Sequence, residues 1–394
     1  MPNFLAEAAA LENELIALRR ELHRRPELGR AEHATSARIQ SELHSLGIEA
    51  LVLAGTGVMG VLRGPQPGKC VALRADMDAL PLQEDSGLPF SSEVPGVAHA
   101  CGHDMHTAAL LGAARLLSMH RNELNGDVVF LFQPDEEGDG GAQRMIDEGC
   151  MEGVDAVFGA HVDPQLPAGT VAVHPGNAYA ASNPFDIIVR GSSAHGAEPH
   201  RGCDAIVAAS AIVGMLQTLV GRAVSPLDSA VITVGSFHAG TARNIIADEA
   251  RLSGILRCFG SEMRQRLSGH MTRAVEGIAA AHGVQAEINI SWGYAGIVND
   301  PAMTDELRAS AQRLLGGENV VDEGFPTLTT EDFGAFLAHA PGAYWHIGAG
   351  RTDGDNPPLH SPRFNPDESA LKIAAALHAQ TAFDFLKNHN QPSH

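Results

Sequence analysis

Apolar residues recur at helical spacing near the start of the chain. Ile39, Leu43 and Leu46 lie three or four positions apart, and Gly47 follows them where a helix would end. Farther along, short apolar runs bounded by Gly and Pro are typical of buried strands. The pattern predicts helices at 3–24, 31–47, 103–117 and 141–148, and strands at 58–62, 70–74, 127–132 and 154–160.

Strands that alternate with helices favour an α/β fold with a mostly parallel sheet. In such sheets ligands gather at the C-terminal ends of the strands. We therefore expect the loops at 75–81, 133–138 and around 161 to lie on one rim of the sheet.

The pattern changes near residue 181. The next 110 or so residues follow a strand–helix–strand–strand–helix–strand order, close to the ferredoxin-like α+β plan. The predicted elements are strands at 185–190, 230–238, 249–259 and 286–291 and helices at 204–220 and 262–282. Beyond Trp292 we expect helices at 301–315, 331–338 and 366–387 and a strand at 343–347. The chain is thus expected to form one discontinuous domain, 1–181 with 293–394, and an inserted domain, 182–292.

Composition excludes several classes of protein. The 394 residues are 44% hydrophobic and 19% charged, which suits a large folded core. A formal net charge of −20 disfavours nucleic acid and anionic membrane as partners. The five cysteines do not suggest a disulfide framework, and Glu7, Glu12 and Glu14 interrupt any signal peptide. The longest apolar stretch, 205–220, is shorter than a membrane span of about 20 residues. We expect a soluble, cytoplasmic protein.

Twenty histidines make metal chemistry the first possibility to consider. Cys101 and His103 stand two apart in a Gly-containing loop ahead of a helix, with His106 one turn on. Thiolate and imidazole suit a shared zinc-like metal site. A buried cysteine beside a polar pair that caps the helix explains the same residues.

A second cluster follows an apolar strand. Asp135, Glu136 and Glu137 are adjacent, and neighbouring carboxylates repel one another unless a cation or a shared proton offsets this. In extended backbone one glutamate can bind a metal while its neighbour faces substrate. An acidic surface turn is the alternative.

Two single histidines complete the set. His161 follows an apolar strand, and His360 lies in a Pro-rich loop before the last helix. Each alone is more typical of a structural histidine. Together with the two clusters they give five donors, more than one catalytic zinc uses. Five donors suit two metals that share a water, with one carboxylate left as a base.

Seven segments, in order along nearly the whole chain, resemble the aminoacylase–carboxypeptidase family of dinuclear metallohydrolases. Within that family the resemblance is to hippurate hydrolases, indoleacetyl–amino acid hydrolases and N-acyl-amino-acid amidohydrolases. The segments are Leu18-Arg-Arg-Glu-Leu-His23-Arg-Arg-Pro26-Glu27, Leu73-Arg-Ala-Asp76-Met-Asp78-Ala-Leu-Pro81, Ala100-Cys101-Gly-His103-Asp-Met-His106, Gln133-Pro-Asp-Glu136-Glu137-Gly138, Ala194-His195-Gly-Ala-Glu-Pro-His200, Gly240-Thr-Ala-Arg-Asn244-Ile-Ile and Leu359-His360-Ser-Pro362.

The resemblance implies a role for each of these residues. Glu136 would be the general base. Asp76 and Asp78 would orient ligand histidines, and Arg74 stands where the wider family often has a ligand histidine. The implied ligands of two divalent metals, whether manganese, zinc, cobalt or nickel, are Cys101, His103, Glu137, His161 and His360.

The resemblance also implies that the inserted domain serves as a lid and dimerises. His195 would reach the active site of the partner subunit in a homodimer and stabilise the oxyanion. Asn244 and Arg257 would bind the carboxylate or carbonyl of the substrate. Asp135 departs from the subfamily, which often has a small apolar residue there, and would either raise the pKa of Glu136 or point to solvent.

The implied activity is hydrolysis of the amide bond of N-acyl-L-amino acids, with acetyl, benzoyl or other aryl-acyl groups. A deacetylase of the N-acetyl-diaminopimelate type or a dipeptidase is the nearest alternative. A catalytically silent homologue that acts as a binding protein is more remote, because Glu136 and all five donors are intact.

Overall fold

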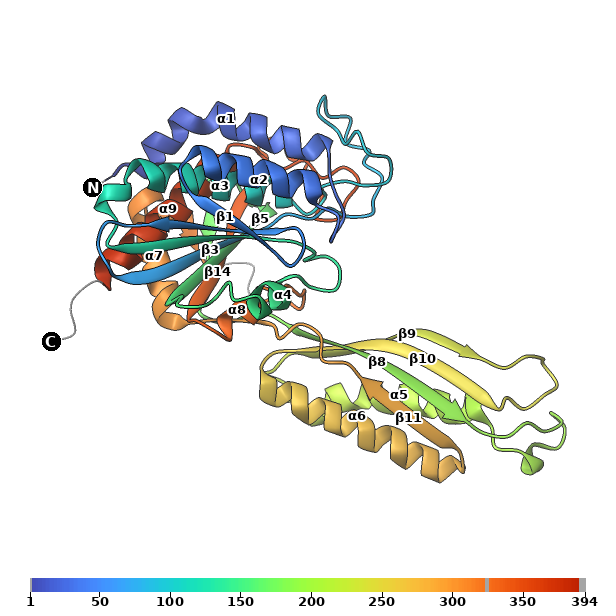
Figure 1. The fold of residues 1–394 in the computed structure, drawn as a ribbon. Coiled ribbons are helices and arrows are strands. Elements are labelled where there is room, and N and C mark those ends of the chain that lie inside the picture. The colour runs from blue at the N-terminus through green and yellow to red at the C-terminus, as the bar shows by residue number, and fades with distance from the viewer. Residues whose placement is uncertain (1, 323–325, 390–394) are drawn as a thin grey trace. The chain divides into compact units, whose positions relative to one another are not determined.

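The computed structural model describes residues 2–322 and 326–389 (Figure 1). The chain divides into two compact units. The first contains residues 1–178, 298–325 and 332–394, and the second contains residues 179–297 and 326–331. That they act as separate catalytic and lid domains, with the boundaries expected from the sequence, stays a prediction.

The first unit is built on an eight-stranded sheet with the order β1-β2-β4-β3-β5-β14-β6-β13. The four strands β4, β3, β5 and β14 pair in parallel, while β1 and β2 extend the edge in antiparallel fashion. This confirms the predicted α/β class with a mostly parallel sheet. The strands are β1 (Glu49–Leu53), β2 (Gly57–Arg63), β3 (Lys69–Asp76), β4 (Gly126–Gln133), β5 (Ala156–Pro167), β6 (Val171–Ala172), β13 (Val320–Val321) and β14 (Gly342–Gly350).

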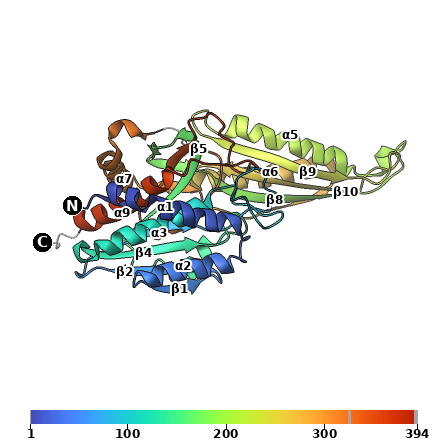
Figure 2. The ribbon, with the colours of Figure 1, turned by 90° about the horizontal axis from the view of Figure 1, so that it is seen from above.

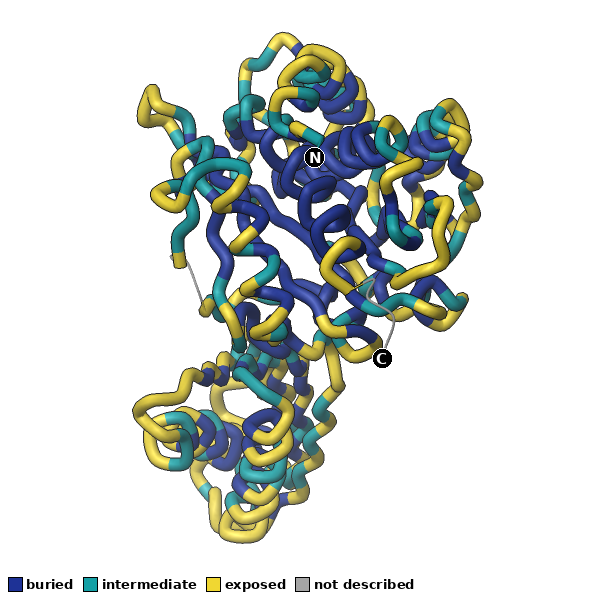
Figure 3. Tube along the Cα trace, turned by 90° about the vertical axis from the view of Figure 1, so that its left-hand side faces the viewer, coloured by how far each residue is buried: buried dark blue, intermediate teal, exposed yellow. Residues whose placement is uncertain are grey.

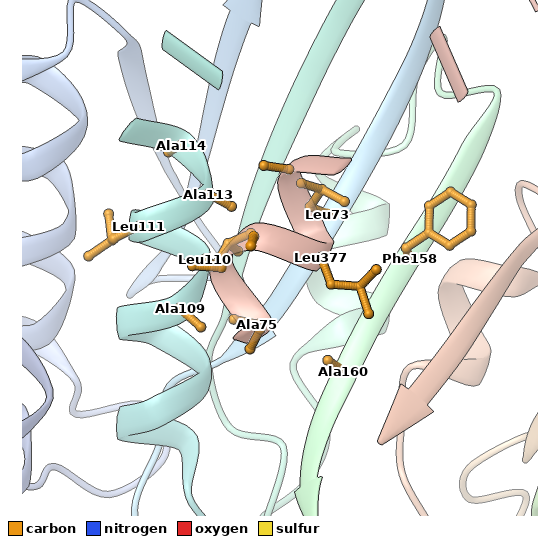
Figure 4. Close-up of a cluster of buried hydrophobic side chains, with 14 of the residues drawn as sticks. Leu73, Ala75, Ala109, Leu110, Leu111, Ala113, Ala114, Phe158, Ala160 and Leu377 are labelled. Carbon is orange, nitrogen blue, oxygen red and sulfur yellow. The ribbon is translucent and has the colours of Figure 1, made fainter. Parts of the chain in front are cut away.

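Helices α1, α3 and α9 pack on one another, and α3 and α9 also contact β3 (Figures 1 and 2). Leu73 of β3, Phe158 of β5, Leu110 of α3 and Leu377 of α9 are fully buried in this core (Figure 4). The helices are α1 (Phe4–Arg24), α2 (His33–Ser45), α3 (His103–Met119), α4 (Ala142–Asp147), α7 (Pro301–Leu315), α8 (Gly334–Leu337) and α9 (Ala370–Asn388), with 3-10 turns at Arg121–Glu123 and Gly317–Asn319.

The second unit has a four-stranded antiparallel sheet with the order β11-β8-β10-β9. Two helices pack on it, and the order confirms the ferredoxin-like plan. Buried chain runs through the interior of each unit beneath exposed loops (Figure 3). The elements are β8 (Ala181–Arg190), α5 (Ala205–Ala223), β9 (Ala230–Ala239), β10 (Glu249–Cys258), α6 (Ser261–His282) and β11 (Gln285–Ile290), with a 3-10 turn at Pro199–Arg201; β7 (Gly176–Tyr179) and β12 (Ile297–Asn299) form a separate two-stranded sheet.

Helix α5 begins at Ala205 because the Asp204 carboxylate accepts hydrogen bonds from two backbone N–H groups of its first turn. Within the described residues it is the one helix that is long and apolar enough to cross a membrane. Ile212 and Leu216 on one of its faces are buried in the core of the second unit. Core helices of this kind pass the same test of length and composition.

Several predicted elements differ from the structure in their bounds; β8, for example, begins at Ala181 and not at 185. Three further differences have a physical reason. Strand β5 runs on to Pro167, because it keeps pairing with β14 beyond His161. Helix α8 is limited to 334–337, since the Asp332 carboxylate is bound to side chains of the sheet instead. Helix α9 begins at Ala370 and not at 366, after a turn in which Asp367 accepts from the N–H of Ser369.

Candidate active site

The C-terminal ends of the central strands bring the predicted motifs together. Asp76 at the end of β3 pairs in register with Gln133 at the end of β4. Helix α3 begins at His103, directly after Gly102, whose φ is 93°. A Cβ on Gly102 would lie 2.4 Å from Val162 of β5, so both its backbone conformation and the close approach require glycine. The glycine therefore lets Cys101 and His103 sit against β5.

All five predicted ligands come together in the first unit. The Cys101 Sγ lies 3.3 Å from Nε2 of His161, and the Glu137 Oε1 lies 3.0 Å from Nε2 of His360. Donor atoms lie within 4.8 Å of one another in each of three overlapping groups. The groups are Cys101 with His103 and His161, Cys101 with Glu137 and His360, and His103 with Glu136 and Glu137.

The chemistry of this donor set fits divalent cations. The Nε2 atom of His103 is buried and has no hydrogen-bond partner among the residues that the structure describes. Burial and the carboxylates of Glu137 and Glu136 raise the pKa of the Cys101 thiol. Burial alone would lower the pKa of His103, but Asp76 and Asp78 outweigh it and raise that pKa to about 10. Protons on Cys101 and His103 thus offset the negative charge of the surrounding carboxylates, and bound divalent cations would offset the same charge.

Hydrogen bonds fix the direction of the ligand imidazoles. Nδ1 of His103 donates to Oδ1 of Asp78 over 3.1 Å, and the other oxygen of Asp78 accepts from the N–H of Glu137 over 3.0 Å. Nδ1 of His161 donates to the Val162 carbonyl over 2.7 Å. In both histidines Nδ1 is thus held by a hydrogen bond and Nε2 faces the donor cluster, the arrangement typical of metal-binding histidines.

His106 has a role that the sequence does not disclose. Its Nε2 accepts from the N–H of Val162 over 2.9 Å, so Nδ1 carries the proton and donates to Asp76 over 2.6 Å. The imidazole therefore joins β3 to β5 immediately beside His161. Asp76 lies against His106 more closely than against His103, whose Nε2 is 3.8 Å away. The only sequence signal is that His106 lies one helical turn after His103.

Arg74 is fully buried and bound to side chains around it. Its Nε donates to Gln133 over 2.9 Å, and its other nitrogens donate to Asp76 and Asp332 over 2.6 and 3.2 Å. Burial opposes ionisation of Asp76, yet His103 and Arg74 hold its pKa well below its usual range. Arg74 thus supplies fixed positive charge beside the site, and a guanidinium does not serve as a ligand.

The first motif, Leu18 to Glu27, contacts the helix that carries His103. Nε of Arg19 donates to Asp104 over 2.7 Å, and His23 Nδ1 lies 2.8 Å from the same carboxylate oxygen. Burial opposes the charge on Asp104, but Arg19 and His23 hold its pKa far below its usual range. Nε2 of His23 lies 3.3 Å from Glu84. This buried network anchors the first turn of α3, and its partners are too far apart in sequence to be paired by pattern.

The second unit places His195 and Asn244 side by side. Residues His195 and Ile245 form a β-bridge, and the N–H of Gly196 donates to the Asn244 carbonyl over 2.8 Å. Nδ1 of His195 accepts from the N–H of Ala197 over 3.1 Å, which leaves the proton on the exposed Nε2.

Arg257 lies at the opposite end of β10 from the His195–Asn244 pair. Its register partner on β8 is Ser182, whereas Glu249 begins the strand at the other end. The guanidinium is half-buried and donates to the Leu328 carbonyl over 2.8 Å. The structure therefore groups two of the three residues expected in the second unit and keeps Arg257 apart from them.

Comparison with known proteins identifies the family. Residues 72–384 match the family model described as peptidase family M20/M25/M40. The chain belongs to this family. This M20 chain is 40% identical to N-acetyl-L-cysteine deacetylase from Bacillus subtilis, over 97% of the chain and 91% of that protein. It is 38% identical to IAA-amino acid hydrolase ILR1-like 2 from Arabidopsis thaliana, over 95% of the chain and 85% of that protein.

A solved structure agrees with the M20 assignment over nearly the whole chain. The Bacillus subtilis YXEP protein, described as a dinuclear metal-binding peptidase of the M20 family, superposes with a TM-score of 0.86. The two are 37% identical, and the match covers 96% of this chain and 99% of that one. The resemblance drawn from the seven segments is thus confirmed, and the protein is an enzyme of the metal-dependent amidohydrolase type.

Proposed function

We propose that this M20 enzyme hydrolyses the amide bond of N-acyl-L-amino acids and releases a carboxylic acid and the free amino acid. The observation that carries the proposal is the buried Glu136 carboxylate at the edge of the donor set. Its Oε2 lies 4.0 Å from Nε2 of His103, and its neighbour Glu137 belongs to the donor set itself. Amide hydrolysis needs this combination of cation-binding groups and an adjacent base.

In this proposal Cys101, His103 and His161 contribute to one side of a two-cation centre, and Glu137 and His360 to the other. Bound divalent cations would polarise the scissile carbonyl and lower the pKa of a water molecule. Zinc, manganese, cobalt and nickel all accept this mixture of thiolate, imidazole and carboxylate ligands. The two carboxylate oxygens of Asp78 accept hydrogen bonds from His103 and from the Glu137 backbone, and so fix the positions of these two ligands relative to each other.

Glu136 acts as the general base and then as the general acid. It takes a proton from the attacking water and later gives that proton to the leaving nitrogen, so that the amine departs neutral. The Glu136 side chain is only 9% exposed, which keeps bulk water from competing for the proton.

We further propose a homodimer in which His195 of one chain serves the active site of its partner. The exposed Nε2–H of His195 is suited to donate to a developing oxyanion, and the neighbouring Asn244 to bind substrate. Strand β9 is an edge of its sheet, and it and the adjoining α5 expose Val231, Phe237, Val207 and Met215. Exposed apolar side chains beside a free strand edge favour association with a second copy.

The relatives differ in acyl group, since one is named for N-acetylcysteine and another for an indoleacetyl conjugate. The proposed substrate class therefore spans acetyl and aryl-acyl groups on an L-amino acid. The test is amine release from N-acetylcysteine, N-acetylmethionine, N-benzoylglycine, indoleacetyl-alanine and N-acetyl-diaminopimelate, with dipeptides as controls. We expect cleavage of at least one N-acyl amino acid at a kcat/KM no less than tenfold above any dipeptide.

Preference for a substrate with a second charged end would favour a deacetylase of the diaminopimelate type. Faster cleavage of dipeptides would overturn the proposal in favour of a dipeptidase. Absence of any cleavage by folded, metal-loaded protein would favour the silent homologue.

A further inference from the structure

Asp135 is buried in the loop that follows β4. Asp135 is only 4% exposed, and its φ is 55°, in the left-handed region. Four non-glycine residues among those described have positive φ, and three of them are Arg30, Asp135 and His360. Conformations of this kind persist only where surrounding contacts impose them. The contacts of Asp135 therefore matter for the two glutamates that follow it.

Two arginines hold the Asp135 carboxylate. Nε of Arg30 donates to Oδ2 over 2.9 Å, and Arg144 of α4 donates to the same oxygen. The other carboxylate oxygen lies between Gly29 and Gly138, where an added Cβ on either glycine would lie 2.2 Å from Oδ1. These glycines have ordinary φ values, so it is the space for the carboxylate that requires them.

The backbone of Asp135 is fixed as firmly as its side chain. Its N–H donates to Oε1 of Glu32 over 2.9 Å, and its carbonyl accepts from the N–H of Gly140 over 3.1 Å. Glu32 is fully buried, and its other oxygen accepts from the Thr56 hydroxyl over 2.6 Å. The turn ahead of α2 thus binds both the main chain and the side chain of Asp135, from a segment that is not itself part of the donor set.

We propose that Asp135, clamped between Arg30 and Arg144, is a positioning residue that sets the direction of Glu136 and Glu137. The clamp holds the peptide at which the chain leaves β4, and the next two side chains are the base and a metal ligand of the proposed function, on which this inference rests. Small displacements of such groups have large effects on catalysis. The burial of Asp135 contradicts the expectation that its side chain points to solvent, whereas the expected effect on the pKa of Glu136 stays a prediction.

The test compares three substitutions in the full-length protein. Asp135→Ala removes the carboxylate and disfavours positive φ, Asp135→Gly removes the carboxylate but permits positive φ, and Asp135→Asn keeps an acceptor and tolerates that φ. Asp139→Asn is the matched control. Asp139 also pairs with Arg30 from the same loop, but its side chain is 77% exposed, and exposed pairs contribute little.

Cobalt(II) gives a readout that does not need turnover. We expect Asp135→Ala and Asp135→Gly each to weaken binding of one cobalt ion by roughly 10- to 100-fold and to change the visible spectrum of bound cobalt. On the best substrate, kcat should fall by a similar factor while KM changes by less than about threefold. Asp135→Asn should lower cobalt affinity and kcat by a smaller factor, and Asp139→Asn should leave both unchanged. Adding Arg30→Gln to Asp135→Ala should cause no further decrease in either.

Wild-type affinity, spectrum and kcat in both Asp135→Ala and Asp135→Gly would overturn the proposal. Full recovery in Asp135→Gly alone would also overturn it, because backbone conformation and not the clamp would then be the cause. If wild-type protein binds cobalt but cleaves no N-acyl amino acid, the proposed function fails. The cobalt affinity and the cobalt spectrum of the variants then still test whether Asp135 positions the two glutamates.

Discussion

Replacement of Glu136 by glutamine is expected to lower kcat by roughly 10²- to 10⁴-fold, the usual contribution of a general base. Glutamine has nearly the same shape but cannot take a proton from water at neutral pH. Because Glu136 is proposed as the base and not as a ligand, the variant should keep the metal content and the KM of the wild type. Steady-state kinetics and metal analysis of the same samples give both numbers.

Glu137→Gln is the matched control for this experiment. The neighbouring carboxylate lies 3.0 Å from His360 and belongs to two of the donor groups, so its loss should lower metal content as well as turnover. A Glu136→Gln protein with wild-type kcat would remove Glu136 as the base. Equal metal loss in both variants would instead make both residues ligands.

Replacement of His195 by alanine is expected to lower kcat by roughly 10²- to 10³-fold, the cost typical of one lost oxyanion donor. The exposed imidazole accepts a hydrogen bond from Ala197 of its own loop, so the variant should remain folded and dimeric. His200→Ala, five residues along the same exposed loop, is the control and should keep wild-type activity. Sedimentation velocity and circular dichroism separate a slow dimer from a dissociated or unfolded one.

Mixing His195→Ala with Glu136→Gln tests whether His195 acts across subunits. In a mixed dimer one active site would combine Glu136 of one chain with His195 of the other. If subunits exchange at random, half the dimers are mixed and carry one complete site each, so activity should recover to about a quarter of wild type. No recovery, with mixed dimers verified, would contradict the cross-subunit role.

Most of the strands and helices within each unit follow from the hydrophobic pattern. The strands that become β3 and β4 are apolar runs buried on both faces, and α3 is apolar nearly all round, so their signals are strong. Strand β1 gave no such signal, because none of its residues is fully buried and its pairing with β2 depends on a hairpin turn at Gly55. The predicted helix 331–338 is longer than α8, because the Asp332 carboxylate accepts a hydrogen bond from the N–H of Ala142 instead of joining the helix.

The donor set could be proposed from the sequence because each of its members stands in a short motif. His103 begins α3, Glu137 follows β4, His161 lies within β5, and His360 lies in the loop between β14 and α9. What supports those donors could not be proposed in this way. The bond from Val162 to His106 joins residues 56 positions apart, and the Arg30–Asp135 pair joins residues 105 positions apart. A single sequence carries no periodicity that relates such positions, so Asp135 could only be recognised as a departure from the subfamily.

The most direct test of the proposed metal-dependent hydrolysis is metal depletion and refilling, followed by amine release from the best substrate of the panel. Protein dialysed against a chelator under reducing conditions, which protect Cys101, would be refilled with manganese, zinc, cobalt or nickel, and bound metal would be counted. We predict that cleavage disappears on depletion and returns as two equivalents of metal bind per chain. Undiminished cleavage by metal-depleted protein, or two bound equivalents that leave cleavage unchanged, would contradict this prediction.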